Sequence, residues 1–128
     1  KVDNTTDLFL DALVWVQLKT ITGTIANDKA AYVFAYGSLD STNFPDTVTG
    51  IDAAITLNDP TQLRLIGIVN IPASLTTYKS EPLSVAAAFG GVLPPVWGIV
   101  IRNYSGLALT ATEADHDAKY RGVFATSV

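Results

Sequence analysis

The sequence predicts an all-β protein, a single-domain β-sandwich of about eight antiparallel strands with jelly-roll-like wiring. Three observations support this fold class. Apolar residues recur at every second position along several stretches, which is the period of a strand with one buried face. Gly, Pro, Asn and Asp separate these stretches at fairly even spacing, and no stretch has a convincing helical period. A β-barrel is the alternative arrangement of such strands.

A chain of 128 residues corresponds to one domain and is long enough to bury roughly two-thirds of its unfolded surface. We expect residues 1–7, which are largely polar, to form an N-terminal arm, and residues 8–128 to form the sandwich. The first strand is expected over residues 8–18, where apolar residues occupy every second position. A helix is possible for so regular a run, but the β-branched residues in and after it favour a strand.

Two further strands are expected in the first half of the chain. Within residues 30–37 the aromatic residues Tyr32, Phe34 and Tyr36 point one way and small residues point the other way. This pattern is typical of a sheet that packs against a second sheet. A long polar loop follows, and residues 48–57 are expected to hold a short strand.

The second half of the chain contains the most regular patterns. Residues 63–71 are largely apolar on both faces, which predicts a strand that is central in its sheet or lies at a subunit contact. A strand is expected over 83–89. Residues 97–112 are expected to form a hairpin of two strands joined by the turn 103–106, which ends in Gly. The last strand is expected over 119–125.

The composition suggests a protein that binds other proteins and does not bind nucleic acid. The formal net charge is −4 and the sequence pI is about 4.6, without a basic run that would hold a phosphate backbone. Charged residues make up 16% of the chain, against about 25% in ordinary globular domains. We therefore expect part of the surface to be covered in a closed symmetric homo-oligomer, a trimer ahead of a dimer.

One stretch raises the question of a membrane. Residues 82–101 contain no charged residue and match the length of a membrane-spanning helix. Pro94 and Pro95, together with three glycines, would break such a helix. We expect strands in this region and no membrane partner.

The sequence offers little for catalysis or cofactor binding. There is no cysteine, and His116 is the single histidine, in an acidic turn. Asp115 and Asp117 are weak candidates for a calcium site, because the stretch lacks the glycine and the long ligand series of a known calcium loop. No residue set matches a nucleophile with its base and orienting acid. We therefore expect neither an enzyme nor a bound cofactor.

Aromatic side chains could bind sugars or lie in a subunit contact. Trp97 alternates with Ile99 and Ile101 and is expected in the core, whereas Trp15, on a mixed face, and Tyr104, in a turn, are expected to be exposed. The full set of candidate interface residues also includes turn and strand positions: Trp15, Tyr104, Asn103, Ser105, Arg64, Ile66 and Ile68.

Several stretches together resemble small virion structural proteins of tailed bacteriophages. They are Tyr32–Asp40, Leu63–Val69, Leu93–Leu109 and Lys119–Val123. The resemblance runs from about Asp11 to the C-terminus, and its most specific parts are Trp-Gly-Ile-Val from position 97 and Tyr-Arg-Gly-Val from position 120. These motifs are structural, so the family brings no catalytic residues to this chain.

The resemblance implies a capsid decoration, or cement, protein that binds the outer surface of a phage head and stabilises contacts between capsomers. Its expected partners are the major capsid protein and further copies of itself, and its expected location is the virion, assembled in the host cytoplasm. A carbohydrate- or receptor-binding module of a tail or fibre is the alternative from another class. A tail-tube or neck protein is a second alternative.

Overall fold

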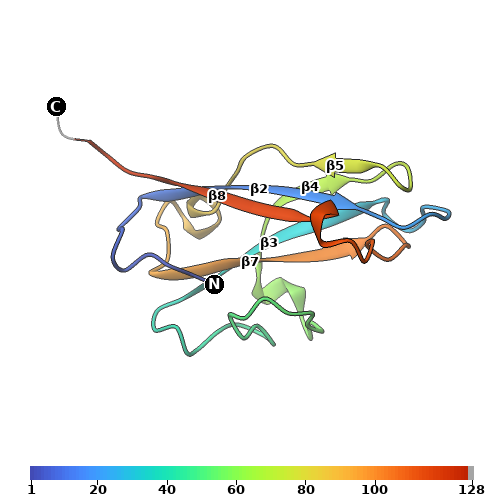
Figure 1. Cartoon of the computed structure of the whole chain (residues 1–128). Coiled ribbons are helices and arrows are strands. Elements are labelled where there is room, and N and C mark those ends of the chain that lie inside the picture. Colours follow the sequence, from blue (N-terminus) through green and yellow to red (C-terminus); the bar gives the residue numbers. More distant parts are fainter. Residues whose placement is uncertain (127–128) are drawn as a thin grey trace.

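The fold is that of a β-sandwich, as the sequence predicts (Figure 1). The computed structural model describes residues 1–126, so positions 127 and 128 of the expected domain lie outside the described residues. The strands are β1 (Val2–Asp3), β2 (Asp11–Lys19), β3 (Ala30–Ser38), β4 (Arg64–Asn70), β5 (Thr77–Lys79), β6 (Leu83–Ser84), β7 (Val96–Tyr104) and β8 (Asp117–Val123). Helical structure in the described part is limited to short 3₁₀ segments: η1 (Pro60–Gln62), η2 (Ala86–Phe89) and η3 (Glu113–Asp115).

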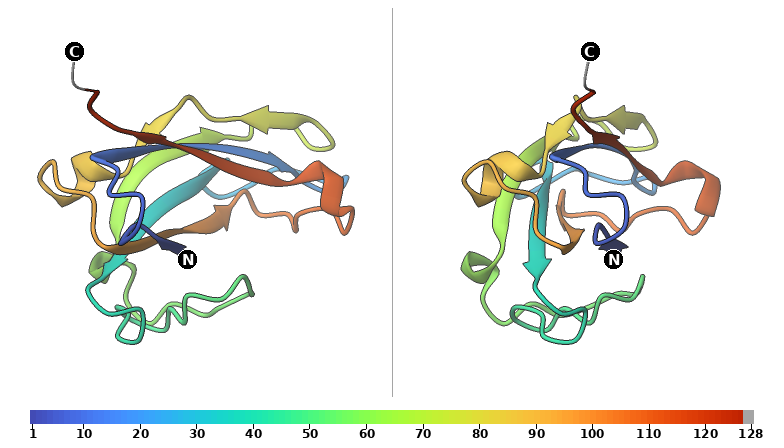
Figure 2. Two further views of the ribbon diagram at one scale, coloured as in Figure 1. Left: turned by 60° about the vertical axis from the view of Figure 1, so that its left-hand side comes forward. Right: turned by 90° about the vertical axis from the view of Figure 1, so that its left-hand side faces the viewer.

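Two sheets form the layers, and all their strand pairs are antiparallel (Figure 2). Sheet A has the order β1-β7-β3-β4. In sheet B, β6 and β8 both pair with the same residues of β2, so they must lie on opposite edges of it. The same reasoning at Gln17, which pairs with both β5 and β8, places β5 on the β6 edge.

The wiring is that of a jelly roll. Successive strand positions alternate between the two sheets, except that β3 and β4 are neighbours in sheet A and β5 and β6 share one edge of β2. Strand β7 returns beside β3, and β8 returns beside β2, so the second half of the chain wraps back along the first.

The edge formed by β5 and β6 is one strand interrupted at Glu81 and Pro82. Before the interruption, Ser80 N donates to Val16 O (2.8 Å), and Val16 N donates to the Ser80 hydroxyl (3.0 Å). The side chain thus replaces a backbone acceptor, and β6 resumes pairing at Leu83. Proline has no N–H to donate to a ladder, which explains why the break falls here.

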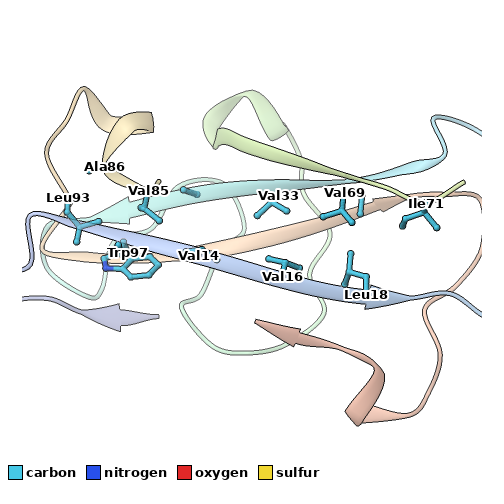
Figure 3. Close-up of a cluster of buried hydrophobic side chains, with 13 residues drawn as sticks. Val14, Val16, Leu18, Val33, Val69, Ile71, Val85, Ala86, Leu93 and Trp97 are labelled. Carbon is cyan, nitrogen blue, oxygen red and sulfur yellow. The ribbon is translucent and has the colours of Figure 1, made fainter. Parts of the chain in front are cut away.

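The main core lies between the sheets and consists mostly of small and branched side chains (Figure 3). Val14, Val16 and Leu18 of β2 face Val33 of β3 across the core. The remaining buried members come from β2, β3, β4, β7 and the segments beside them: Ala12, Ala31, Ala35, Val69, Ile71, Val85, Ala86, Leu93 and Trp97. The prediction that Trp97 is a core residue is confirmed, since only 2% of its surface is exposed.

The aromatic face of β3 lies outside this core. The small residues Ala31, Val33 and Ala35 face sheet B, while Phe34 and Tyr36 point outward into a second, smaller core. That outer core contains buried Tyr36, Val48 and Leu63 with partly buried Phe34, Phe44, Ile55, Leu57 and Val100. The long loop 39–62 covers it on the outer side of sheet A (Figure 2).

Carboxylates hold the covering loop in shape. The carboxylate of Asp40 accepts hydrogen bonds from Thr42 N (2.9 Å) and Asn43 N (2.8 Å). The carboxylate of Asp46 accepts from Asn58 N (3.0 Å) and Asp59 N (2.9 Å), which ties the two arms of the loop together. The short strand expected over 48–57 does not form. These residues are irregular and have no strand partner in the described part of the chain.

Other strand predictions also need correction. The first strand begins at Asp11, because Leu8 lies at positive φ and both Leu8 and Leu10 are exposed. The strand expected over 83–89 ends at Ser84 and continues as η2. The Asp11 carboxylate accepts from the Ser84 hydroxyl (2.6 Å) and from Ala86 N (2.8 Å), so it fixes the start of that turn.

The predicted hairpin 97–112 is also wrong. Its first strand and its turn exist, with Gly106 at φ +78°, but the chain after the turn does not return along β7. It crosses to sheet B, where Leu109 bridges to Thr20. The pairing of Leu107–Thr112 with β7 is therefore replaced by contact with the end of β2.

The N-terminal residues are part of the fold. Val2 and Asp3 pair with Trp97 and Val96 of β7, and Asn4 is buried. The Asn4 side chain also closes the following turn, accepting from Phe9 N (2.9 Å) and donating to Phe9 O (3.0 Å). The arm expected over 1–7 is thus docked against the sandwich.

Candidate protein-binding surfaces

A cleft of about 790 Å³ lies at one side of the sandwich. It follows β7 from Trp97 to Arg102. Residues 48–57 of the covering loop form one wall, and Ala118–Tyr120 of β8 form the other. Val14 of β2 contributes from between the sheets. The cleft therefore opens the side of the sandwich, where the two sheets end.

The cleft has an aromatic entrance and a basic rim. The rings of Trp97 and Tyr120 meet edge to face, with centroids 5.1 Å apart, and Tyr120 remains 45% exposed. Three basic residues and one acidic residue line the cleft: Lys1, Arg102, Lys119 and Asp52. The Lys119 ammonium itself lies away from the cleft, near the Trp15 ring and 3.0 Å from Asp117. The sequence did not predict this site, because it depends on where two strands end in space.

Trp15 lies on the outer face of sheet B and is half-buried, so its predicted exposure is only partial. Lys79 of β5 and Lys119 of β8 place their ammonium groups 5.7 and 5.9 Å from its ring centroid. Such contacts stabilise a partly exposed indole by about 0.5–1 kcal/mol each. This surface is basic and aromatic, and the lysine stems restrict access to the ring.

Tyr104 closes β7 as part of a small exposed cluster. Its ring meets Tyr32 edge to face at 6.2 Å, and the Arg102 guanidinium lies 4.6 Å from its centroid. The Tyr32 hydroxyl donates to Asp28 (2.7 Å), and this hydrogen bond is the main cause of the raised pKa of Tyr32. The exposure predicted for Tyr104 is confirmed at 36%.

Asn103 and Ser105, two other interface candidates, have a structural role in the turn. Asn103 Nδ2 donates to Leu107 O (2.6 Å), and Asn103 Oδ1 accepts from the Ser105 hydroxyl (2.6 Å). Ser105 is fully buried and presents no surface to a neighbour. The sequence predicted a turn at these residues. Their polar groups form hydrogen bonds within that turn and are not available to a partner.

The candidates Arg64, Ile66 and Ile68 lie on β4, which is an edge strand. Of the two predicted placements the central one is wrong, and the subunit contact stays a prediction. Phe34 pairs with Leu65 and Val33 with Gly67, so Ile66 is the extra residue of a β-bulge. Ile66 turns toward the main core, whereas Arg64 and Ile68 are exposed. The bulge changes which residues of β4 face the core, so apolar residues fall on both faces of the strand. Ile68 remains exposed and can contact another protein.

The acidic stretch 113–117 does not assemble a metal site. Asp115 accepts from the Thr110 hydroxyl (2.7 Å), which is the main reason its pKa is lowered, and it also contacts Lys19 (3.5 Å). Asp117 pairs instead with Lys119 (3.0 Å). Within residues 1–126, no group of three or more His, Cys, Asp and Glu side chains comes together.

His116 is held by the same stretch. Its Nε2 lies 2.9 Å from Thr110 O, and its Nδ1 is buried without a hydrogen-bond partner among the described residues.

None of the helices described is long and apolar enough to cross a membrane.

Exposed apolar residues gather where β2 begins and β8 ends. Leu10 N donates to Val123 O (2.7 Å), and the rings of Phe9 and Phe124 lie 6.4 Å apart. Four side chains there are substantially exposed: Leu8 (70%), Leu10 (58%), Val123 (39%) and Phe124 (63%). We call these four residues the terminal apolar patch.

Comparison of the chain with protein-family models, with curated proteins and with solved structures finds no match in any of the three.

Proposed function

We propose that the protein is a virion structural protein, a capsid decoration protein that binds the outer surface of a phage head. The terminal apolar patch is the observation that carries the proposal. Leu8 and Leu10 enter β2 and Val123 and Phe124 leave β8, so the patch rests on the longest pairing of sheet B. Exposed apolar side chains grouped in this way mark contact surfaces between proteins.

Two further observations support a binding role. The chain carries few charged residues, and its fold forms a rigid two-sheet body that can present a fixed surface. The Trp-Gly-Ile-Val and Tyr-Arg-Gly-Val stretches resemble those of virion structural proteins, which supports a binding role within a phage particle. A decoration protein would act through many modest interfaces, each dependent on buried area and shape fit.

Co-sedimentation with expanded, emptied phage heads tests the proposal. The wild-type protein should sediment with the heads. The double variant Leu8→Asn and Phe124→Ser should bind at least about tenfold more weakly, since two apolar contacts are lost. Asn tolerates the positive φ of position 8 (+53°), so the fold is preserved.

Leu39→Ser is the matched control, because Leu39 is 86% exposed but lies outside the patch. It should bind heads as the wild type does. Failure of the wild type to sediment with heads would contradict the proposal.

A carbohydrate- or receptor-binding module is the second candidate, favoured by the half-exposed Trp15 on the outer face of sheet B. A glycan array distinguishes the two functions. Glycan binding that Trp15→Ala abolishes, without head binding, would replace the decoration role. A tail-tube or neck position would instead place the protein away from the head in a reconstruction of the particle.

Self-association is part of the same proposal. A closed homo-oligomer, a trimer ahead of a dimer, would cover some of the exposed apolar surface. Light scattering at micromolar concentration should give the mass of the oligomer, and a monomer mass would contradict this part.

A further inference from the structure

Three loops meet at the end of the sandwich that lies away from the terminal apolar patch. They join β2 to β3, β4 to β5 and β7 to β8, and they form the right-hand end in Figure 1. The register fixes this placement, because Ala30 of β3 pairs with both Asn70 and Tyr104. Three stretches of these loops contain no Asp, Glu, Lys or Arg: residues 20–27, 71–77 and 105–112. We call these three stretches the uncharged end.

Backbone hydrogen bonds tie the three loops together. Ile21 N donates to Ala108 O (3.0 Å), which joins the first loop to the last. Ile71 N donates to Lys29 O (2.7 Å), which joins the second loop to the first. The uncharged end is therefore a fixed surface and not a set of separate loops.

Apolar side chains project from this surface. Leu75 is 56% exposed and Ile21 is 41% exposed. Leu75 also lies at φ +55°, a backbone conformation that bulky side chains rarely adopt. Such conformations cost free energy and gather at binding and functional sites. The exposure and the strain of Leu75 both indicate a contact surface.

Charged residues border the uncharged end. The nearest ones in the sequence are Lys19, Asp28, Lys29, Lys79, Arg102 and Glu113. Lys19 contacts Asp115 at 3.5 Å, and the Arg102 guanidinium lies on the ring of Tyr104, on the outer face of sheet A. A centre depleted of charge inside a polar rim is the usual anatomy of a contact between proteins.

The charge of the chain favours a second copy as the partner. Each copy has a formal net charge of −4, so two copies repel each other. A contact through the uncharged end buries no unpaired charge, and burial of such a charge would be costly. A second copy brings the same uncharged surface, so both sides of the contact meet this condition.

We propose that the uncharged end is the surface through which copies of this chain associate. The inference rests on the self-association proposed above and names its contact surface. In a cyclic oligomer the contact surfaces of all copies surround one axis. The terminal apolar patch, at the opposite end of β2, then remains free to bind a head.

Substitution of Leu75 tests this surface on the intact protein. Leu75→Asp adds a charge to each copy, and Asp adopts a positive φ more readily than Leu, so the fold is preserved. Light scattering over a dilution series should show that the dissociation constant of the oligomer rises about a hundredfold. An unchanged dissociation constant would overturn the proposal.

Leu75→Asn separates the added charge from the lost apolar contact. Asn has nearly the size of Asp and also tolerates a positive φ, but it is uncharged. It should raise the dissociation constant only about tenfold, because one buried apolar side chain is lost. Equal effects of Asn and Asp would contradict an interface that excludes charge.

Leu8→Asp is the matched control at the other end of the sandwich. Leu8 is 70% exposed and lies at φ +53°, so the change in side chain, exposure and backbone is nearly the same. Leu8→Asp should leave the dissociation constant of the oligomer within about twofold and should weaken sedimentation with heads. Leu75→Asp should still sediment with heads. The reverse pattern would exchange the roles of the two ends and overturn the proposal.

The dependence on salt is a test of the wild-type protein. The dissociation constant should not rise between about 50 mM and about 500 mM NaCl, because no ion pair holds the copies together and salt screens their repulsion. A rise of about tenfold would mean that ion pairs form the contact, against the proposal.

Hydrogen exchange locates the contact without any substitution. The amides of residues 20–27 and 71–77 should exchange more slowly as the protein concentration rises. A wild-type monomer would contradict the self-association itself. An oligomer without this protection would contradict only the assignment to the uncharged end, and head binding through the terminal apolar patch is measured separately.

Discussion

The main core and the outer core of this protein bury apolar side chains by different means. In the main core, Val16, Val33 and Ile71 are fully buried between two hydrogen-bonded sheets. In the outer core, Tyr36 and Val48 are buried against one sheet and an irregular loop. The loop keeps its shape through side-chain carboxylates and has no backbone ladder to sheet A.

This difference teaches that burial and rigidity are separate properties. The burial of each side chain in the outer core depends on the loop 39–62, which can move away from sheet A without breaking a strand pair. Regions with few backbone hydrogen bonds open locally at a lower free energy than the sheets do. The loop is also a wall of the cleft, so a part of the molecule that can open locally borders the cleft.

Ile71→Ala should give the largest effect, because Ile71 has no exposed surface. We expect a loss of about 3–4 kcal/mol in the free energy of unfolding, measured by urea denaturation. Leu57→Ala in the outer core should cost only about 1 kcal/mol, since Leu57 is partly buried and the loop can collapse onto the space. Equal losses would show that the two cores are equally rigid.

Gly98→Ala should destabilise the protein by about 2 kcal/mol, because the added methyl group would overlap the ring of Tyr36. In the background of Tyr36→Leu the same substitution should cost much less. A double-mutant cycle from urea denaturation gives the coupling between the two sites. Strict additivity would mean that Tyr36 does not pack over Gly98 in solution.

Asp46→Asn should cost about 1 kcal/mol, since the amide retains only one acceptor oxygen for the N–H groups of Asn58 and Asp59. Hydrogen exchange should accelerate at Asn58 and Asp59 and stay unchanged in β2. If exchange accelerates equally in both places, the loop unfolds together with the sheets.

Asp40 should produce the smallest effect, visible in the pH dependence of stability. Hydrogen bonds from Asn43 N and Thr42 N lower the pKa of Asp40 well below its ordinary value of 3.8. Its stabilisation is therefore complete above pH 3.8 and is lost as the pH falls from there toward the lowered pKa of the folded state. Urea midpoints from pH 5 to pH 2 should fall less steeply for Asp40→Asn than for the wild type.

Strands with strict alternation could be predicted from the sequence. β2, β3, β4 and β8 each fall within a few residues of their expected ranges. Alternation does not tell which face is buried when both faces are apolar. The aromatic face of β3 packs under a loop, and the bulge at Ile66 mixes the two faces of β4.

Pairing was harder to predict than strand position. The stretch after Gly106 has the alternation of a hairpin strand, but its partner is the end of β2 and not β7. The candidate binding surfaces show the same difference between local sequence and spatial arrangement. The exposure of Tyr104 depends on local sequence and was predictable, whereas the cleft depends on how β7, β8 and the loop lie in space and could not be predicted from the sequence.

The pairing of β2 with β8 joins Asp11 to Val123, so two segments far apart in the sequence must meet before sheet B is complete. Contacts between residues so distant in sequence slow folding, and β-sandwiches of this kind fold in roughly milliseconds to seconds. During synthesis β2 leaves the ribosome well before β8. The nascent chain must therefore keep one edge of β2 unpaired until β8 has been made, which makes this edge a point of risk for misassembly in the cell.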